Sequence, residues 1–248
     1  MQPPGNAARE QLRAQLANAY IQPGYSPRSH LLIPTVIGLC GIAAMLALLR
    51  ELRLVELMTI PLTLVGGFGL EWRVHKDILH RRVPPFQILY DRHERLHHVI
   101  FTEDDMGLRS RREFKLVLLP TFVIVLILLL LLPLGLLLAQ VVPRNCALLF
   151  IATSLFFFLM YEWLHLAYHL PEQTRLGRNP LIARLRELHK RHHDPRLMKR
   201  WNFNVTVPLF DWLHGTLYSP EREARAARRS LRRSAVRIPG DPAPPAER

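Results

Sequence analysis

The run "LVLLPTFVIVLILLLLLPLGLLLA", residues 116–139, contains no charged side chain. About 20 apolar residues in a helix are enough to cross the roughly 30 Å hydrocarbon core of a bilayer at about 1.5 Å per residue. Three further apolar runs occupy residues 31–49, 54–70 and 146–168. The run at 54–70 contains Glu56, Pro61 and three glycines, so a bent or re-entrant segment is an alternative there. The sequence therefore predicts an all-α, polytopic membrane protein with four transmembrane helices.

Composition leaves two classes of protein open, and the apolar runs decide between them. The chain has 248 residues, of which 49% are hydrophobic, and a net charge of +13. Such a charge suits either a nucleic-acid-binding protein or a membrane protein with a basic cytoplasmic face. The hydrophobic residues are collected in long runs, and no nucleic-acid-binding motif accompanies the arginines. We therefore expect a membrane protein and no nucleic-acid partner.

The links between the runs predict how the chain crosses the membrane. "RELR" (50–53) and "QVVPRN" (140–145) are short, so the four spans form two hairpins with both links on one side. These links contain three of the 33 Lys and Arg residues, whereas the segment 71–115 alone contains ten. Positive residues favour the cytoplasmic side. We therefore expect both termini, the segment 71–115 and everything after the fourth span in the cytoplasm.

Two terminal segments flank the predicted membrane region. Residues 1–30 lack the pattern of a signal peptide, and "REQLRAQLANAYI" (9–21) has the apolar spacing of an interfacial helix, although an ordinary terminal helix fits equally well. Residues 220–248 are rich in arginine and then in proline, which predicts a disordered tail. The arginines of this tail would face anionic lipid headgroups.

Histidine is concentrated in the segments predicted to lie in the cytoplasm. Ten of the twelve histidines fall into four blocks, "HKDILH", "HERLHH", "HLAYH" and "HKRHH". These ten residues are His75, His80, His93, His97, His98, His165, His169, His189, His192 and His193. His30 and His214 lie outside the blocks, and we expect structural roles for them. Two hairpins would thus each deliver two blocks to one surface, and we expect a cytoplasmic helical cap to carry these histidine motifs.

The spacing within the blocks indicates metal binding. Residues four apart share a helix face, which pairs His93 with His97, His165 with His169, and His189 with the 192/193 pair. His75 and His80 are five apart, so they need a π-bulge, a helix end or two different ions. Adjacent histidines point about 100° apart, as expected where neighbours contact different ions. Two metal ions are the simplest interpretation.

Other interpretations of these histidines are open. A single histidine near a membrane is usually a hydrated interfacial residue, but ten converging without a metal would repel one another on protonation. A metal transporter would place its ligands near the bilayer midplane, and a b-type haem protein would use one histidine on each of two facing spans. The blocks lie at helix ends, and only His165 and His169 approach the membrane interior. A non-enzymatic protein that binds or moves a metal is still an alternative.

The order of the blocks, H-x4-H, H-x3-HH, H-x3-H and H-x2-HH, resembles the fatty acid hydroxylase and sterol desaturase superfamily of integral-membrane non-haem diiron enzymes. The similarity extends over residues 71–218 and includes "HHVIFTEDDM" and "WNFNVTVPLFDWLHGTLY". It implies that the ten histidines ligate two iron ions, with zinc as a substitute in purified protein. It also implies a membrane hydroxylase domain at 31–219. Asp77, Glu94, Asp194 and Asp211 are candidates to orient the ligands, or to pair with arginines instead.

The resemblance further implies a reaction of O2 with a C–H bond of a membrane lipid. Hydroxylation of a fatty acyl, sterol or related hydrocarbon is the expected outcome, and desaturation is the nearest alternative. Two electrons per cycle must come from elsewhere, because the chain has no Gly-rich nucleotide motif and only two cysteines, Cys40 and Cys146, in separate spans. We therefore expect a separate donor of the ferredoxin, rubredoxin or cytochrome type, with its reductase.

Overall fold

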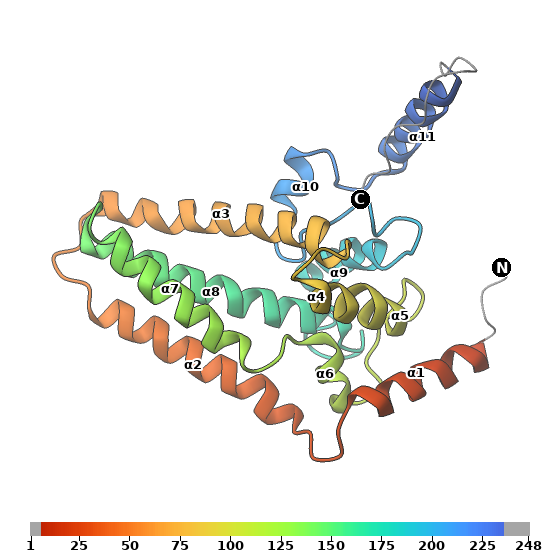
Figure 1. Cartoon of the computed structure of the whole chain (residues 1–248), viewed down its shortest axis with the longest axis horizontal. Coiled ribbons are helices and arrows are strands. Elements are labelled where there is room, and N and C mark those ends of the chain that lie inside the picture. Colours follow the sequence, from red (N-terminus) through yellow and green to blue (C-terminus); the bar gives the residue numbers. More distant parts are fainter. Residues whose placement is uncertain (1–5, 236–248) are drawn as a thin grey trace.

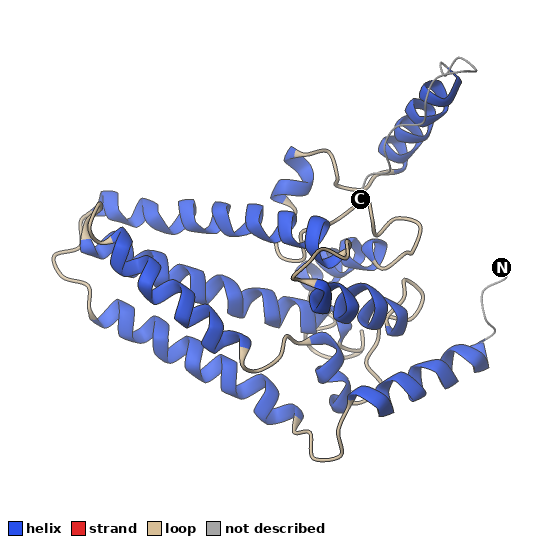
Figure 2. Cartoon of the chain, viewed as in Figure 1, coloured by secondary structure: helices blue, strands red, loops and turns tan. Residues whose placement is uncertain are grey.

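The computed structural model describes residues 6–235 of the chain, and within this range it contains helices, turns and loops but no β-strand (Figure 2). The expected all-α class is therefore confirmed. Four long helices lie side by side: α2 (Pro27–Ala47), α3 (Thr59–Val74), α7 (Val123–Leu138) and α8 (Arg144–His169) (Figure 1). Helix α8 packs against the other three.

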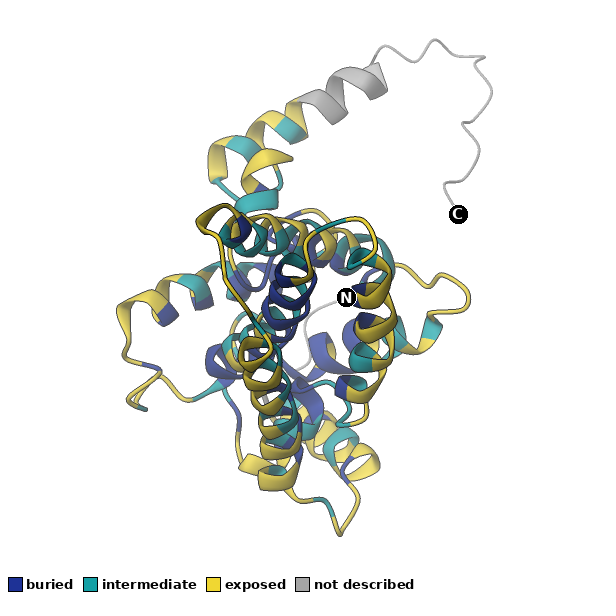
Figure 3. Cartoon of the chain, turned by 90° about the vertical axis from the view of Figure 1, so that its left-hand side faces the viewer, coloured by how far each residue is buried: buried dark blue, intermediate teal, exposed yellow. Residues whose placement is uncertain are grey.

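Close packing between these helices depends on small residues. A Cβ atom added to Gly38 of α2 would lie 2.9 Å from Leu159 Cδ1 of α8, and one added to Gly135 of α7 would lie 2.4 Å from Ile151 Cδ1. Both distances are below van der Waals contact, so glycine permits the approach of each helix to α8. Viewed along the helices, buried residues gather in the middle of the molecule and exposed residues on the outside (Figure 3).

Within residues 6–235, three helices are long and apolar enough to cross a membrane. They are Pro27–Ala47, the continuous helical stretch Leu54–Leu79 and Arg144–His169. The second stretch begins as a 3-10 helix, η1 (Leu54–Met58), and continues through α3 into a π-helix, η2 (His75–Leu79). Many apolar side chains on the outer faces are exposed, among them Leu32, Val36 and Leu62. An outer surface with this many exposed apolar side chains suits contact with lipid.

The expectation of a single helix over residues 116–139 is wrong. The chain forms a short helix, α6 (Phe114–Val117), then a non-helical segment, and α7 begins only at Val123. Pro120 lacks an N–H and disfavours a helical conformation at Leu119. The Leu119 N–H donates instead to the Glu162 carboxylate of α8, at 3.2 Å. Helix α7, with 16 residues, is about 24 Å long and shorter than the roughly 30 Å core.

The expectation of disorder from residue 220 is also wrong for the part of the tail that the structure describes. Helix α11 runs from Pro220 to Ala235 and projects away from the rest of the molecule (Figure 1). Alanine, glutamate and arginine are strong helix formers, so this composition supports a helix without tertiary packing. Residues 236–248 lie outside the described residues, as do residues 1–5.

The N-terminal segment forms helix α1 (Asn6–Tyr20), close to the helix expected over 9–21. Leu16 of α1 and the following Ile21 pack against a buried cluster that includes Phe101 and Leu116. The C-terminal part of α1 is therefore packed against this buried cluster.

The remaining helices gather at the end of the molecule where α3 and α8 terminate (Figure 1). They are α4 (Gln87–Arg92), the π-helix η3 (His93–His97), α5 (His98–Ile100), η4 (Arg111–Glu113), α9 (Pro180–His192) and α10 (Leu209–Leu213). We call this end of the molecule the cap. The histidine blocks all lie in the cap or at the helix ends that enter it.

Candidate metal centre

Two π-helical turns bring histidines five residues apart onto one side. η2 begins at His75, and His80 follows its last residue. The two imidazoles stack with centroids 5.1 Å apart. A π-helix forms i→i+5 hydrogen bonds, so it aligns residues at this spacing better than an α-helix does. Of the arrangements left open for this pair, the structure has the π-helical one.

The second π-turn corrects one pairing expected from spacing. η3 begins at His93, which places His93 Nε2 3.1 Å from His98 Nε2. His97 instead turns toward α8, with its Nε2 3.3 Å from His165 Nε2. His93 and His97 therefore do not share a site, although they are four residues apart.

The ten histidines form two groups of five. Within each group the facing ring nitrogens lie within 4.8 Å of one another, and all ten side chains are buried. The first group contains His75, His80, His93, His98 and His192. The second group contains His97, His165, His169, His189 and His193. The adjacent pairs 97/98 and 192/193 are each divided between the groups, as expected, whereas His189 and His192 are separated.

The spacing of the Nε2 atoms fits a cation at the middle of each group. His75 and His93 present Nε2 atoms 2.9 Å apart in the first group, and His189 and His193 present them 3.1 Å apart in the second. Two imidazoles bound to one metal at about 2.0–2.1 Å place their nitrogens about 2.9–3.4 Å apart, for right-angle to tetrahedral arrangements. The donor set and its separations therefore suit one metal ion per group.

The pair His80 and His192 makes the fit more specific. His80 Nδ1 donates to Glu94 Oε2 at 3.0 Å, and His192 Nδ1 donates to the Trp201 carbonyl at 3.0 Å. Each neutral ring therefore carries its proton on Nδ1, and its Nε2 holds a lone pair. The two Nε2 atoms lie 2.9 Å apart. Two lone pairs at this distance repel each other unless a cation lies against both.

Backbone carbonyls orient four of the other eight rings in the same way. The Nδ1 atoms of His75, His97, His169 and His193 donate to the carbonyls of Phe203, Leu116, Met106 and Phe101, respectively. An Nδ1–H bond of this kind fixes the ring and leaves Nε2 as the ligand atom. His98 Nδ1 and His189 Nδ1 are buried and have no hydrogen-bond partner among the described residues.

Burial keeps these histidines neutral. Burial, followed by the charge of neighbouring imidazoles, holds the pKa of His93, His98 and His189 well below the usual value of 6.5. Burial lowers the pKa of His97 to about 4. Neutral imidazole is the form that binds a metal ion, so the groups are ready to accept ions at neutral pH.

The four carboxylates suggested by the sequence have different surroundings. Glu94 contacts a histidine of the first group directly and also accepts from Tyr90 Oη and pairs with Lys199 Nζ at 2.9 Å. Burial raises the pKa of Glu94, but the hydrogen bonds from His80 and Lys199 outweigh it, so the net shift is downward. Glu94 therefore faces His80 as a carboxylate.

The other three candidates do not bond to a histidine in the described part of the chain. Asp77 pairs with Arg73 at 2.8 Å, and Asp194 pairs with Arg196 at 2.6 Å. Both follow the alternative of arginine pairing. Asp211 accepts from the backbone N–H groups of Phe203 and Asn204, at 2.9 and 2.7 Å. It thus holds the segment whose Phe203 carbonyl orients His75.

Sequence reasoning missed Glu71. Its buried carboxylate accepts from the backbone N–H of Val205 and from the N–H and hydroxyl of Thr206, at 3.0 and 2.6 Å for Thr206. These bonds join α3 to the segment that carries the acceptors for His75 and His192. A charged residue at the end of an apolar run was the available signal.

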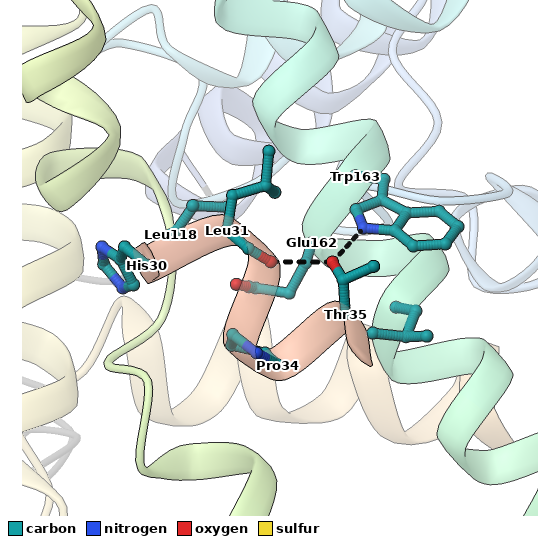
Figure 4. Close-up of a pocket in the computed structure, with 8 residues that line it drawn as sticks. His30, Leu31, Pro34, Thr35, Leu118, Glu162 and Trp163 are labelled. Carbon is teal, nitrogen blue, oxygen red and sulfur yellow. Dashed lines mark hydrogen bonds between the residues drawn. The ribbon is translucent and has the colours of Figure 1, made fainter. Parts of the chain in front are cut away.

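His30 and His214 lie outside both groups. His30 Nε2 contacts the Leu119 carbonyl at 2.8 Å, and His214 stacks on Trp72. His30 also lines a small cavity between α2 and α8, together with Thr35, Glu162 and Trp163 (Figure 4). With a volume of about 10 Å³, this cavity has room for about one water molecule.

Comparison with known proteins identifies the family. The family model described as "Fatty acid hydroxylase" matches residues 60–216, which is more than half of the chain. The chain belongs to the fatty acid hydroxylase family. This membership makes it an oxidoreductase of a membrane-embedded, lipid-acting family, and the matched residues contain all ten clustered histidines.

A solved structure shares the fold of this family member. It is described as "Full length scs7p (only hydroxylase domain visible)" and aligns with a TM-score of 0.52 at 20% sequence identity. The alignment covers 77% of this chain and 67% of that chain. A comparison with curated proteins gave no match.

Proposed function

We propose that this member of the fatty acid hydroxylase family is an O2-dependent lipid hydroxylase whose two histidine groups hold two iron ions. The observation that carries the proposal is the pair of five-imidazole groups, with lone pairs of facing Nε2 atoms 2.9–3.4 Å apart. The hydroxylase domain named in the solved structure of similar fold supports the same reaction class.

Each part of the centre has a role in this proposal. Iron bound by nitrogen ligands supplies the oxidising power, drawn from O2, that an unactivated C–H bond requires. The ten histidines would hold the ions through Nε2, and the Nδ1–H bonds to carbonyls and to Glu94 would keep the rings in place. Their exposed fractions of 0–8% indicate that the protein excludes bulk water from the centre.

We further propose that the chain crosses the membrane four times, with both termini and the centre in the cytoplasm. Three helices of sufficient length support this arrangement, and the apolar segment 118–138 would supply the fourth crossing, with α7 as its helical part. The position of the cap at the ends of α3 and α8 supports entry of a lipid chain from the bilayer. On this proposal residues 31–219 form the hydroxylase domain, and residues 1–30 lie in the cytoplasm.

The same proposal requires a separate electron donor. Insertion of one oxygen atom of O2 and reduction of the other to water consume two electrons per cycle. Cys40 and Cys146 are free thiols on α2 and α8 and are too few for an iron–sulfur or rubredoxin-type site. A ferredoxin, rubredoxin or cytochrome with its reductase would supply the electrons. The excess of positive charge favours an acidic carrier and salt-sensitive association.

Reconstitution tests this function. Purified protein loaded with iron is incubated with membrane lipid, O2 and NAD(P)H, with and without a reductase–carrier pair, and products are separated by mass spectrometry. We expect a hydroxylated lipid only with the carrier. A lipid that loses two hydrogens would indicate desaturation instead. Binding of two ions without any lipid product in the complete system would favour the metal-binding alternative. Zinc in the purified protein would not count against iron, because zinc binds imidazole tightly.

A further inference from the structure

The second histidine group is hydrogen-bonded to a loop that belongs to neither α8 nor α9. Residues 101–108 follow α5 and reverse direction at Thr102, whose carbonyl accepts from the Asp105 N–H at 2.9 Å. Within this loop the Phe101 carbonyl accepts from His193 Nδ1 at 2.6 Å, and the Met106 carbonyl accepts from His169 Nδ1 at 2.9 Å. Two of the five rings of the second group thus depend on the position of one loop.

The loop makes further contacts with the same group. The Leu108 N–H donates to the His169 carbonyl at 2.9 Å, and the Phe101 ring lies 4.6 Å from the His169 ring and 5.2 Å from the His97 ring. The ring acceptors of the first group come from elsewhere, namely Glu94, Trp201 and Phe203. A shift of the 101–108 loop would therefore disturb the second group first.

Helix α1 holds this loop from the outside through one buried arginine. Arg13 is only 5% exposed. Its guanidinium donates to Asp105 at 3.1 Å, to the Gly107 carbonyl at 2.8 Å and to both oxygens of Glu113, at 2.8 and 3.3 Å. It also lies over the Phe101 ring, with Cζ 5.0 Å from the centroid. One side chain of α1 therefore contacts both ends of the loop.

These contacts depend on Arg13 remaining in place. A buried guanidinium is costly unless its donors are satisfied, and its removal would leave the buried Glu113 carboxylate without its main partner. The planar fork of arginine matches the bidentate contact with Glu113 and the stacking on Phe101, which a lysine cannot reproduce. Arg9 adds a bond to Thr102 Oγ1 at 2.6 Å from the same face of α1.

We propose that α1 is a positioning element for the second metal site, acting through Arg13 and the 101–108 loop. This inference rests on the proposed two-ion centre and goes beyond it, because α1 lies outside the family match at 60–216 and supplies no ligand. Loss of Arg13 should release the Phe101 and Met106 carbonyls from their places. His193 and His169 would then lose orientation, while the first group keeps its own acceptors.

Iron stoichiometry tests this proposal without any activity measurement. Full-length wild-type protein and Arg13→Met are loaded with Fe2+ without oxygen and dialysed against a chelator that buffers free Fe2+, and iron per chain is measured by plasma mass spectrometry. We expect two ions in the wild type. Arg13→Met should keep about one, because loss of a ligand's hydrogen-bonded support typically weakens metal affinity about 10–100-fold. Arg53→Met is the control, since Arg53 pairs with Glu56 at 3.2 Å in the link between α2 and η1, at the end of the molecule opposite the cap (Figure 1), and it should keep two ions.

Double variants assign the ion that is lost. Arg13→Met combined with His169→Ala should still bind one ion, whereas Arg13→Met combined with His75→Ala should bind almost none. If Arg13→Met does not fold, Asp105→Asn is used instead, because it removes one loop contact and leaves the Arg13–Glu113 pair. Asp105→Asn should lower the affinity for one ion and leave the affinity for the other unchanged. Two ions bound at wild-type affinity in both Arg13→Met and Asp105→Asn, or equal loss of metal from both groups, would overturn the role of α1 but not the two-ion centre. Fewer than two ions in the wild type would overturn the two-ion centre as well.

Discussion

His97 and His98 are neighbours in the chain, but their imidazoles belong to different groups. His98 Nε2 lies 3.1 Å from His93 Nε2 in the first group, and His97 Nε2 lies 3.3 Å from His165 Nε2 in the second. The π-turn η3 produces this division, because it aligns residue 93 with residue 98. On the proposed two-ion centre, substitutions at these adjacent residues would therefore affect different ions.

Substitution of these neighbours should remove different metal ions. We expect His97→Ala and His98→Ala each to retain about one of two ions and to abolish lipid oxidation, because the reaction needs both. The double variant should bind almost none. His98→Ala with His192→Ala, both in the first group, should still retain about one. Metal analysis of the purified variants measures this.

His214→Gln is the control for these variants, since the exposed His214 stacks on Trp72 outside both groups. It should keep two ions. Loss of both ions in each single variant would show that the groups do not bind independently.

Glu94→Gln should weaken the first site specifically. The change keeps an oxygen near His80 Nδ1 but removes the negative charge that supports the ligand. We expect roughly a tenfold loss of affinity for one ion, at the low end of the effect of such partners. Competition with a metal-binding dye gives the two affinities separately.

Asp77→Asn provides the comparison with a carboxylate that pairs with cationic side chains and, among the described residues, with no histidine. Asp77 pairs with Arg73 and, at 3.8 Å, with Arg81. Its substitution should leave both affinities unchanged. An equal effect of the two substitutions would argue against a specific role for Glu94.

Glu71→Ala should destabilise the protein by at least roughly 1–3 kcal/mol, the cost of leaving a buried hydrogen-bond donor without its acceptor. The change would leave the donors of Val205, Thr206 and Asn204 without their acceptor. Thermal unfolding in detergent, compared with wild type, measures the loss. Glu187→Ala removes an exposed i,i+4 pair with Arg191 and should cost less than about 0.5 kcal/mol. Equal unfolding temperatures for the two variants would contradict the role of Glu71.

Membrane topology is tested by single cysteines in a variant without Cys40 and Cys146. Cysteines at Glu103 and Glu223 should react only with reagents that reach the cytoplasm, and one at Val141 only with reagents outside, because the cap and the α7–α8 link lie at opposite ends of the helices (Figure 1). Labelling of Glu103 and Glu223 from opposite sides would contradict the proposed topology.

Spacing in the sequence predicts part of the centre and leaves part undetermined. The five-residue interval from His75 to His80 admits a π-turn, and the structure has one. His93 has a histidine both four and five residues later, so spacing alone could not choose His98 over His97. The sequence also could not show that the carbonyls of Phe101, Met106, Leu116 and Trp201 accept from histidine rings, because every residue carries a carbonyl.

For the membrane helices, too, the sequence pattern predicts only part of the structure. Apolar runs predict where helices lie, but hydropathy does not detect the break at Leu118–Phe122, since most of those residues are apolar and none is charged. Pro120 was the available sign of the interruption. The contact between Arg13 and Glu113, 100 residues apart, depends on tertiary structure and could not be read from local pattern.

The most direct test of the central claim is the origin of the oxygen atom in the product. Iron-loaded protein is supplied with membrane lipid, a reductase–carrier pair and 18O2 in ordinary water, and the lipid is examined by mass spectrometry. The account predicts one 18O atom in each hydroxylated lipid and no product from the His97→Ala variant. Oxygen derived from water, or undiminished product from that variant, would contradict it.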